Sequence, residues 1–467
     1  MAVTSSRFDV AVVGAGPGGL AAAEAAVGAG ARVALVDGAG QPGGQYWRHP
    51  AGDLDAVADL HHGLKTFRAQ VRAVDAATTF FGHQVWTIEK VAAGFVVRAV
   101  VAGTEVEIAA TSLVLAPGAY DRQLPFPGWD LPGVYTAGGA QALLKGNQVL
   151  AGRRVVVGGT GPFLLPVASG LAARGAKVAG VFEANSPLGW VRRLPAVLPV
   201  AGKLTEGAGY TAALARHRVP YRSRHAIVAA HGTDRVTAVT VARLDRDWRI
   251  VAGSQQRVEC DAVAVGWGFT PQLELPLAVG CATRVDVDGS VVVQVDEAQR
   301  SSVPGVYVAG EACGVGGAAL ATVEGAVAGR AAAAVATGRA AGAGAVPRRL
   351  VGQRNRLRAF ASAMHRTHPV RDGWRDWLTD ETLVCRCEEV SAGRLREATD
   401  ELGATDARSA KLLSRAGMGW CQGRVCGYAT SCLVAAWSGR PFEPGAAAER
   451  PVAVPIPLGL LSQHPGT

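Results

Sequence analysis

The sequence lacks long hydrophobic runs and is poor in cysteine. No stretch of about 18 apolar residues is free of glycine, proline and charge, so we expect no transmembrane helix. Residues 1–8 contain no apolar run of signal-peptide length, and we therefore expect no cleaved leader. Eight cysteines among 467 residues are too few for a disulfide scaffold. Together these absences favour a protein of the reducing cytoplasm.

Glycine and arginine are the residues in notable excess. The 60 glycines follow no G-X-Y repeat, and 49% apolar against 18% charged residues excludes a disordered chain. The net charge of +9 raises the question of nucleic acid. Eight arginines against one acid lie between residues 347 and 375, however, and the rest is nearly balanced. We therefore expect no nucleic acid partner but a local basic segment, either packed on acidic surface or simply solvated.

A glycine-rich turn near the N-terminus is typical of dinucleotide binding. An apolar strand over 8–13 leads into this turn, and an alanine-rich helix follows it. Glycines there permit a tight turn, a close approach to pyrophosphate and close helix packing. A second strand ends at Asp37, which is placed to accept hydrogen bonds from an adenosine ribose. The predicted turn residues are Gly14, Gly16, Pro17, Gly18 and Gly19.

The same pattern recurs in the middle of the chain. A strand over 154–159 meets a turn with Gly159 and Gly161, and a later strand ends at Glu183. The third glycine position holds Leu164, which should push the helix away and reshape the pyrophosphate site. Two interpretations stay open: a fold that has lost its nucleotide, or a site for NAD(H) or another adenine nucleotide.

Two further segments indicate FAD. Residues 111–119, with Gly118, resemble a strand of two-dinucleotide flavoproteins, and a strand over 303–311 delivers Gly310 and Glu311. An acid there suits the ribityl hydroxyls, and the helix opened by Gly317 and Ala318 can point at the flavin pyrimidine. The FAD domain is then discontinuous. The expected segments are 1–150 plus 285–345 for FAD, 151–284 for the inserted NAD-like fold, 346–378 for a basic linker, 379–435 for a cysteine-rich domain and 436–467 for a tail.

Redox-active disulfide chemistry finds no support in the sequence. Residues 42–48 lack cysteine, and the inserted fold holds only Cys260 and Cys281, which are too far apart for a CxxC pair. We expect both, and Cys313, to be core residues. No hydrolytic constellation is visible either. The scattered histidines, including His61, His62, His365 and His368, are expected at the surface.

Four cysteines near the C-terminus indicate a metal centre. They form a CxC pair, Cys385 and Cys387, and a Cx4C pair, Cys421 and Cys426. Zinc knuckles normally use CxxC, whereas iron–sulfur clusters tolerate varied spacing. We favour [2Fe–2S] over zinc or free thiols. Helices are expected over 391–402 and 406–415, and the glycines at 417, 419, 423 and 427 can offer amides to cluster sulfurs.

Over nearly its whole length the chain resembles the larger flavin subunit of bacterial heteromeric amine and imino-acid dehydrogenases. This family includes the larger flavin subunits of opine oxidase and of hydrogen cyanide synthase, and the alpha-type subunit of D-hydroxyproline dehydrogenase. Its cysteine block is similar to the bacterioferritin-associated ferredoxin type of [2Fe–2S] domain. The matching segments are Gly43-Gly44-Gln45 with Trp47-Arg48, 125–141, 266–271, Gly310-Glu311, 385–389 and 415–426.

The resemblance implies an α/β fold like that of glutathione and thioredoxin reductases, with a small helical [2Fe–2S] domain. It implies FAD at Gln45 and the positions named above, and a cluster on the four cysteines. It also implies two partners, namely a small ferredoxin-like gamma subunit together with a D-amino-acid-oxidase-like FAD beta subunit. Pro117, in place of a possible donor, and Leu164 depart from the pattern.

Three functions follow as hypotheses. The first is an electron relay within a heteromeric amino-acid or opine dehydrogenase, from a two-electron flavin to a one-electron cluster. The second is a self-sufficient NADH-dependent reductase, with hydride entering through the fold that ends at Glu183. The third is a scaffold that carries the cluster without turnover of its own.

Overall fold

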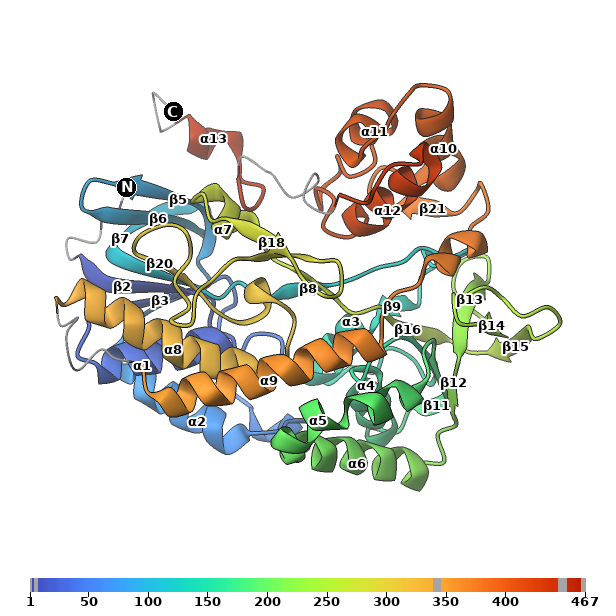
Figure 1. Cartoon of the computed structure of the whole chain (residues 1–467), viewed down its shortest axis with the longest axis horizontal. Helices are drawn as coiled ribbons and strands as arrows, with labels where there is room; N and C mark the ends of the chain where they lie inside the picture. Colours follow the sequence, from blue (N-terminus) through green and yellow to red (C-terminus); the bar gives the residue numbers. More distant parts are fainter. Residues whose placement is uncertain (1, 4–6, 339–345, 444–451, 463–467) are drawn as a thin grey trace.

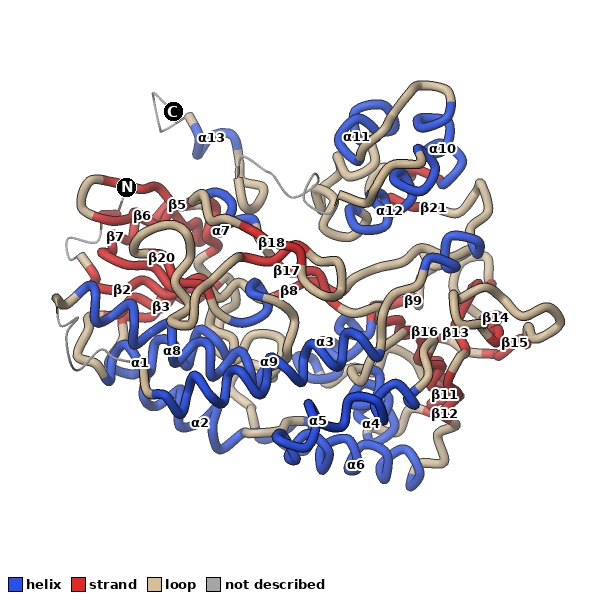
Figure 2. Tube along the Cα trace, in the orientation of Figure 1, coloured by secondary structure: helices blue, strands red, loops and turns tan. Residues whose placement is uncertain are grey.

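The computed structural model describes residues 2–3, 7–338, 346–443 and 452–462. Two α/β lobes lie side by side, and a small helical lobe sits above the second (Figure 1). Figure 2 shows that strands fill the centre of both large lobes while helices cover their lower faces. The α/β class predicted from the sequence is confirmed. Residues 339–345 and parts of the expected tail lie outside the described residues.

The first lobe is built on an eight-stranded sheet of order β4-β3-β2-β7-β6-β5, with β1 and β20 also paired to β7. β2 is buried along almost its whole length, as a parallel strand covered on both faces must be. β20 pairs in parallel with β7 beside Leu113–Leu115, although it lies almost 200 residues later. Its strands are β1 Ala2–Val3, β2 Phe8–Val13, β3 Val33–Asp37, β4 Thr78–Phe81, β5 Gln84–Val91, β6 Gly94–Val101, β7 Thr104–Leu115 and β20 Val306–Val308.

Two helices, α1 (Pro17–Gly28) and α8 (Ala318–Ala336), cross under this sheet in close contact. A Cβ on Gly325 would lie 1.9 Å from the Gly18 carbonyl oxygen, and one on Gly329 would lie 2.0 Å from that of Ala22. Among the described helices, α8 alone is long and apolar enough to cross a membrane, but 67% of that stretch is buried inside the protein. α8 is therefore a core helix of this lobe.

The second lobe has a five-stranded parallel sheet of order β12-β11-β10-β16-β9 and an antiparallel sheet β13-β14-β15. Strand β9 pairs with β16, so residues 134–136 belong to this lobe although the sequence placed the boundary near 150. The two chain crossings between the lobes pair as β8 with β17. These crossings favour a division near 120 and 270, because β8 and β17 lie there. The elements are β8 Ala119–Asp121, β9 Val134–Thr136, α3 Ala137–Asn147, β10 Arg154–Gly159, α4 Leu164–Ala173, β11 Lys177–Glu183, α5 Leu194–Val197, α6 Ala201–Arg216, β12 Tyr221–Ser223, β13 His225–His231, β14 Ala238–Arg243, β15 Gln256–Glu259, β16 Ala262–Gly266 and β17 Phe269–Pro271.

The basic segment forms a long helix, α9 (Arg348–Thr367), which packs on α8 and continues toward the second lobe. The predicted helices of the cysteine-rich domain are confirmed within two residues, as α10 (Ala392–Asp400) and α11 (Ala407–Ser414). Trp248, Trp267 and Trp377 pack together beneath this domain. The remaining elements are α2 Leu64–Ala73, α7 Glu274–Ala278, β18 Thr283–Val285, β19 Val291–Val293, β21 Leu383–Cys385, β22 Val390–Ser391, α12 Gly427–Ser438 and α13 Leu458–Leu461.

The α1–α8 contact gives the first prediction. Gly325→Ala should destabilise the first lobe by about 3 kcal/mol, because its new methyl group meets backbone that cannot move independently. Gly28→Ala, at the exposed end of α1 with open space around it, should be neutral or stabilise by up to about 1 kcal/mol. Thermal unfolding followed by circular dichroism compares the two variants. Equal unfolding temperatures would show that the helices can separate at little cost.

Candidate functional site: a flavin cavity beside four cysteines

The first glycine-rich turn has the geometry that a pyrophosphate requires. Gly14 has φ +102°, and a Cβ there would lie 2.2 Å from the Ala116 carbonyl oxygen. A Cβ on Gly19 would lie 1.6 Å from the Gly14 oxygen, so any side chain would force α1 off β2. α1 begins at Pro17 with no side-chain cap. Its first-turn N–H groups are thus available for a negatively charged ligand.

Asp37 closes the adenosine side of this turn. Its carboxylate accepts the Ala15 N–H at 2.5 Å and the Ala39 N–H at 2.7 Å. The side chain stays partly exposed and lines the same cavity as the glycine turn. An acid held at this place by backbone donors can still accept a ribose hydroxyl.

One cavity of about 1860 Å³ collects nearly all the residues predicted to bind FAD. Its volume exceeds the usual 300–1,000 Å³ of small-ligand pockets, as an extended dinucleotide requires. Gly19 is the exception, since it lies beneath the turn and acts through packing. Gln45 reaches the cavity, but its amide oxygen accepts from Arg48. The predicted residues lining the cavity are Gly14, Gly16, Pro17, Gly18, Asp37, Gln45, Gly118, Gly310, Glu311, Gly317 and Ala318, together with Gly161 of the second turn.

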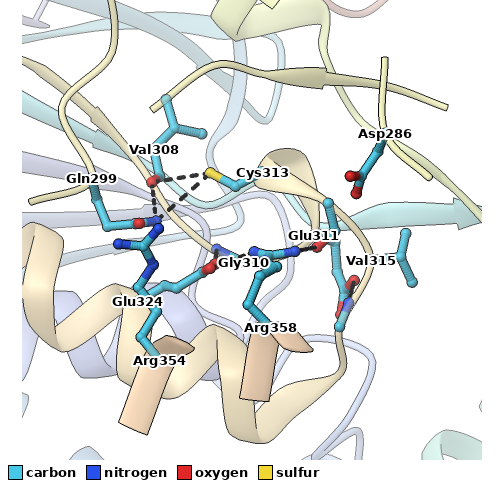
Figure 3. A network of polar contacts seen from close by, with 12 residues as sticks. Asp286, Gln299, Val308, Gly310, Glu311, Cys313, Val315, Glu324, Arg354 and Arg358 are labelled. Atoms are coloured by element: carbon cyan, nitrogen blue, oxygen red, sulfur yellow. Dashed lines mark hydrogen bonds and ion pairs between the residues drawn. The ribbon is translucent and has the colours of Figure 1, made fainter. Parts of the chain in front are cut away.

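A polar network shapes the far end of the cavity (Figure 3). The Glu311 carboxylate accepts the N–H groups of Gly316 at 2.9 Å and Gly317 at 3.0 Å. Buried Glu324 on α8 accepts the Gly310 N–H at 3.0 Å and pairs with Arg358 of α9. Arg358 also donates to the Gly314 carbonyl at 2.7 Å. Residues 310–317 are therefore fixed from both sides before any ligand arrives.

Burial governs the protonation of this network. Desolvation raises the pKa of Glu311 to about 6 and outweighs its two backbone hydrogen bonds. Burial also raises the pKa of the Cys313 thiol well above its usual value, while its sulfur donates to the Val308 carbonyl at 3.2 Å. Cys260, Cys281 and Cys313 are all buried, so their prediction as core residues is confirmed.

The four C-terminal cysteines come together from two loops. Cys385 shares a thiol hydrogen bond with Cys426, and Cys387 shares one with Cys421. The bond from Cys426 lowers the pKa of Cys385 to about 5, and Gly417 N–H also points at its sulfur, 3.5 Å away. A Cβ on Gly419 would lie 2.3 Å from the Cys387 Cβ, so this glycine permits the close approach of the loops.

The pairing of the thiols fits a binuclear cluster. Within the described residues, no three His, Cys, Asp or Glu side chains are placed to hold one metal ion. A structural zinc ion needs four ligands around one point, whereas each iron of a [2Fe–2S] cluster takes two thiolates. Two thiol pairs side by side therefore suit the cluster better.

The second cysteine loop faces the flavin cavity. Trp420, Cys421 and Arg424 all line it. Arg424 Nε lies 2.8 Å from a carboxylate oxygen of Glu274 and 3.0 Å from the Tyr120 hydroxyl oxygen. Its guanidinium also donates to the Ala453 carbonyl. Since Tyr120 follows Gly118 by two residues, Arg424 links the cysteine loop directly to the flavin lobe.

Two family descriptions match the chain. Residues 8–338 match "Pyridine nucleotide-disulphide oxidoreductase", and residues 383–436 match "BFD-like [2Fe-2S] binding domain". The chain belongs to the pyridine nucleotide-disulphide oxidoreductase family. It has the family's FAD/NAD(P)-binding fold joined to a [2Fe–2S]-binding domain.

Related proteins cover almost the whole chain. Hydrogen cyanide synthase subunit HcnB of Pseudomonas protegens is 31% identical over 90% of this chain and 91% of that protein. The larger flavin subunit of opine oxidase from Agrobacterium tumefaciens is 32% identical over 99% and 93%. The solved L-proline dehydrogenase of P. horikoshii shares the fold, with a TM-score of 0.70, 21% identity, and coverage of 99% and 80%. This oxidoreductase is thus related to subunits of heteromeric enzymes.

Unlike the first turn, the second nucleotide turn of this oxidoreductase is closed. Its helix α4 begins at Leu164, five residues after Gly159, whereas α1 begins three residues after Gly14. Glu183 is 1% exposed, and its carboxylate accepts the Gly161 N–H at 2.8 Å and the Thr160 hydroxyl at 2.8 Å. His368 at the end of α9 covers it, with Nδ1 3.5 Å away. The prediction that Leu164 reshapes this turn is consistent with the late start of α4.

Sequence reasoning missed three residues of the cavity. His365 and His368 were expected at the surface, and that prediction is wrong. The His368 side chain is 7% exposed, and His365 lies 2.7 Å from the Val315 carbonyl oxygen. Lys145 is buried, which lowers its pKa to about 8, and it donates to the Tyr46 carbonyl at 3.2 Å. No motif surrounds these residues, so no local signal was available for them.

The raised pKa of Glu311 predicts a pH dependence. The carboxyl of the unfolded chain ionises near pH 4.5 and that of the folded flavin-free protein near pH 6. Between these values the folded state binds more protons, so rising pH lowers the free energy of unfolding. Glu311→Gln should remove this slope, seen as unfolding temperatures across pH 5 to 7, whereas exposed Glu401→Gln should keep it. A slope unchanged in Glu311→Gln would contradict the assignment.

Proposed function

We propose that this chain relays electrons from FAD to a [2Fe–2S] cluster within a heteromeric amine dehydrogenase. The observation that carries the proposal is the shared cavity, which reaches from the Gly14 turn to Cys421. Bound FAD would supply two-electron chemistry there, and the cluster one-electron chemistry. A single protein-lined space between the two sites keeps their separation short without a mobile carrier.

The residues of this chain hold and orient the two groups. The first-turn N–H groups of α1 would bind the pyrophosphate and Asp37 the ribose. The N-terminus of α8, at Gly317 and Ala318, would place a positive partial charge beside the flavin. Cys385, Cys387, Cys421 and Cys426 would ligate the cluster, with the Cys421 edge toward the flavin.

The donor and the partners are part of the proposal. The two relatives above are named as subunits, one of an opine oxidase. We propose that a D-amino-acid-oxidase-like beta subunit oxidises a CH–NH or CH–NH2 bond with its own FAD, and that a small ferredoxin-like gamma subunit completes the complex. The free cysteines of the described residues fit the cytoplasm as the place of action.

The NADH-dependent reductase is the second candidate, and one observation speaks against it. An entering adenosine ribose would have to displace His368 and break the Glu183 contacts with Thr160 and Gly161. Asp37 faces no such cover in the first fold. The scaffold hypothesis leaves the cavity beside Cys421 without a purpose.

Stopped-flow absorption of the anaerobically purified protein tests the relay. The protein should contain FAD, iron and sulfide. NADH should leave the flavin oxidised, while an amine substrate should reduce flavin and cluster only when the beta subunit is present. Rapid bleaching by NADH alone would establish the reductase instead. Colourless protein, or zinc in place of iron, would overturn the cofactor assignment.

Arg424 provides a test within the chain. Arg424→Met removes the ion pair to Glu274 while keeping an apolar stem. It should slow flavin-to-cluster transfer by about tenfold or more, because small misplacements of reacting groups are costly. The control Arg408→Met, on the exposed face of α11, should transfer at the wild-type rate. Cluster content from the visible spectrum separates slow transfer from cluster loss. An unchanged rate in Arg424→Met would show that the link is dispensable.

A further inference from the structure

A second cavity, separate from the flavin cavity, lies beyond the end of β11. Its volume is about 720 Å³, and its inner wall includes Asn185 and buried Trp248. Asn185 is fixed there because its amide donates to the Thr160 hydroxyl at 2.7 Å and the Pro369 carbonyl at 2.9 Å. The cavity lies at the carboxyl edge of a parallel sheet, where open α/β folds bind ligands.

Arginine dominates this cavity. Six arginines and a single acid, Asp245, line it, so the local charge is strongly positive. Asp245 uses one carboxylate oxygen to accept two backbone N–H groups, from Asp247 and Arg249. Among the described residues, none of the six guanidinium groups forms an ion pair with an acid. The arginines are Arg192, Arg193, Arg224, Arg246, Arg366 and Arg371.

The six residues come from separate parts of the chain. Arg192 and Arg193 follow β11 in a short helical turn, Arg224 precedes β13, and Arg366 ends α9. Arg193 is held in place by donating to the Gly189 carbonyl at 2.8 Å. Gathering like charges around one concavity is unfavourable unless an anion compensates them, and a concave wall strengthens their field.

We propose that this cavity binds a small, multiply charged phosphate compound. Guanidinium groups present paired N–H donors that match phosphate oxygens, and several of them can surround one polyphosphate. The volume lies within the range of small-molecule sites, which favours such a ligand over a macromolecular surface. The site is distinct from the flavin cavity, and its occupancy would bear on α9, whose end it contacts through Arg366.

Isothermal titration of the full-length, cofactor-loaded protein with inorganic tripolyphosphate tests the site at fixed ionic strength. We expect saturable binding. Arg224→Ala/Arg366→Ala should weaken it by about a hundredfold, because two charge-assisted contacts are lost. The control Arg330→Ala/Arg349→Ala removes equal charge from exposed positions outside the cavity and should bind as the wild type does.

The outcomes separate the possible ligands. Equal loss in both double variants would overturn the site in favour of general charge attraction. Absence of saturable binding would overturn it too, and would leave the arginines to an acidic protein partner. Adenosine triphosphate is the second probe. If the Arg224→Ala/Arg366→Ala variant loses binding of both probes, tighter binding of the nucleotide identifies a nucleotide site, and equal binding identifies a site for the phosphate chain alone.

Discussion

The close contact between α1 and α8 is the constraint on which the flavin site depends. Because Gly325 and Gly329 lack side chains, the backbone of α8 lies directly against that of α1. The N-terminus of α8 therefore comes to the same end of the sheet as the N-terminus of α1. Two helix N-termini from opposite ends of the sequence then face one cavity, and both favour negative charge. Much of the glycine excess serves this packing rather than ligand contact.

The basic segment has acquired a specific structural meaning. One of its arginines, Arg358, neutralises Glu324 inside the protein, and Arg354 donates to the Glu297 carbonyl. A buried ion pair is costly to break from one side, because the remaining charge loses its partner. α9 is thereby fixed against the loop over 310–317. The same helix ends at His368 above Glu183, so a single element supports one nucleotide turn and covers the other.

Local sequence carried the prediction of the first nucleotide turn, the cluster cysteines and the helices between them. Each depends on residues close in sequence, and strand, turn and helix periodicities are local signals. The position of α9 was beyond such signals, because Arg358 and Glu324 are matched only by folding. His365, His368 and Lys145 were missed for the same reason. The domain boundary near 150 was displaced because β9 joins its sheet by pairing with β16, a contact with no local sequence signature.

The two nucleotide folds have diverged in a way that gives the electrons one direction. In the first, Asp37 holds the turn and keeps an exposed side, so a ligand can enter. In the second, Glu183 makes comparable backbone contacts but is covered by His368. With that entrance covered, reducing equivalents would enter the flavin cavity from elsewhere. The wall of that cavity at Cys421 is held by Arg424, whose contacts with Tyr120 and Glu274 join the cluster loop to the chain crossing between the lobes. A flavin at the first turn would therefore have a fixed exit, and its source of electrons would have to be a partner that reaches the same cavity.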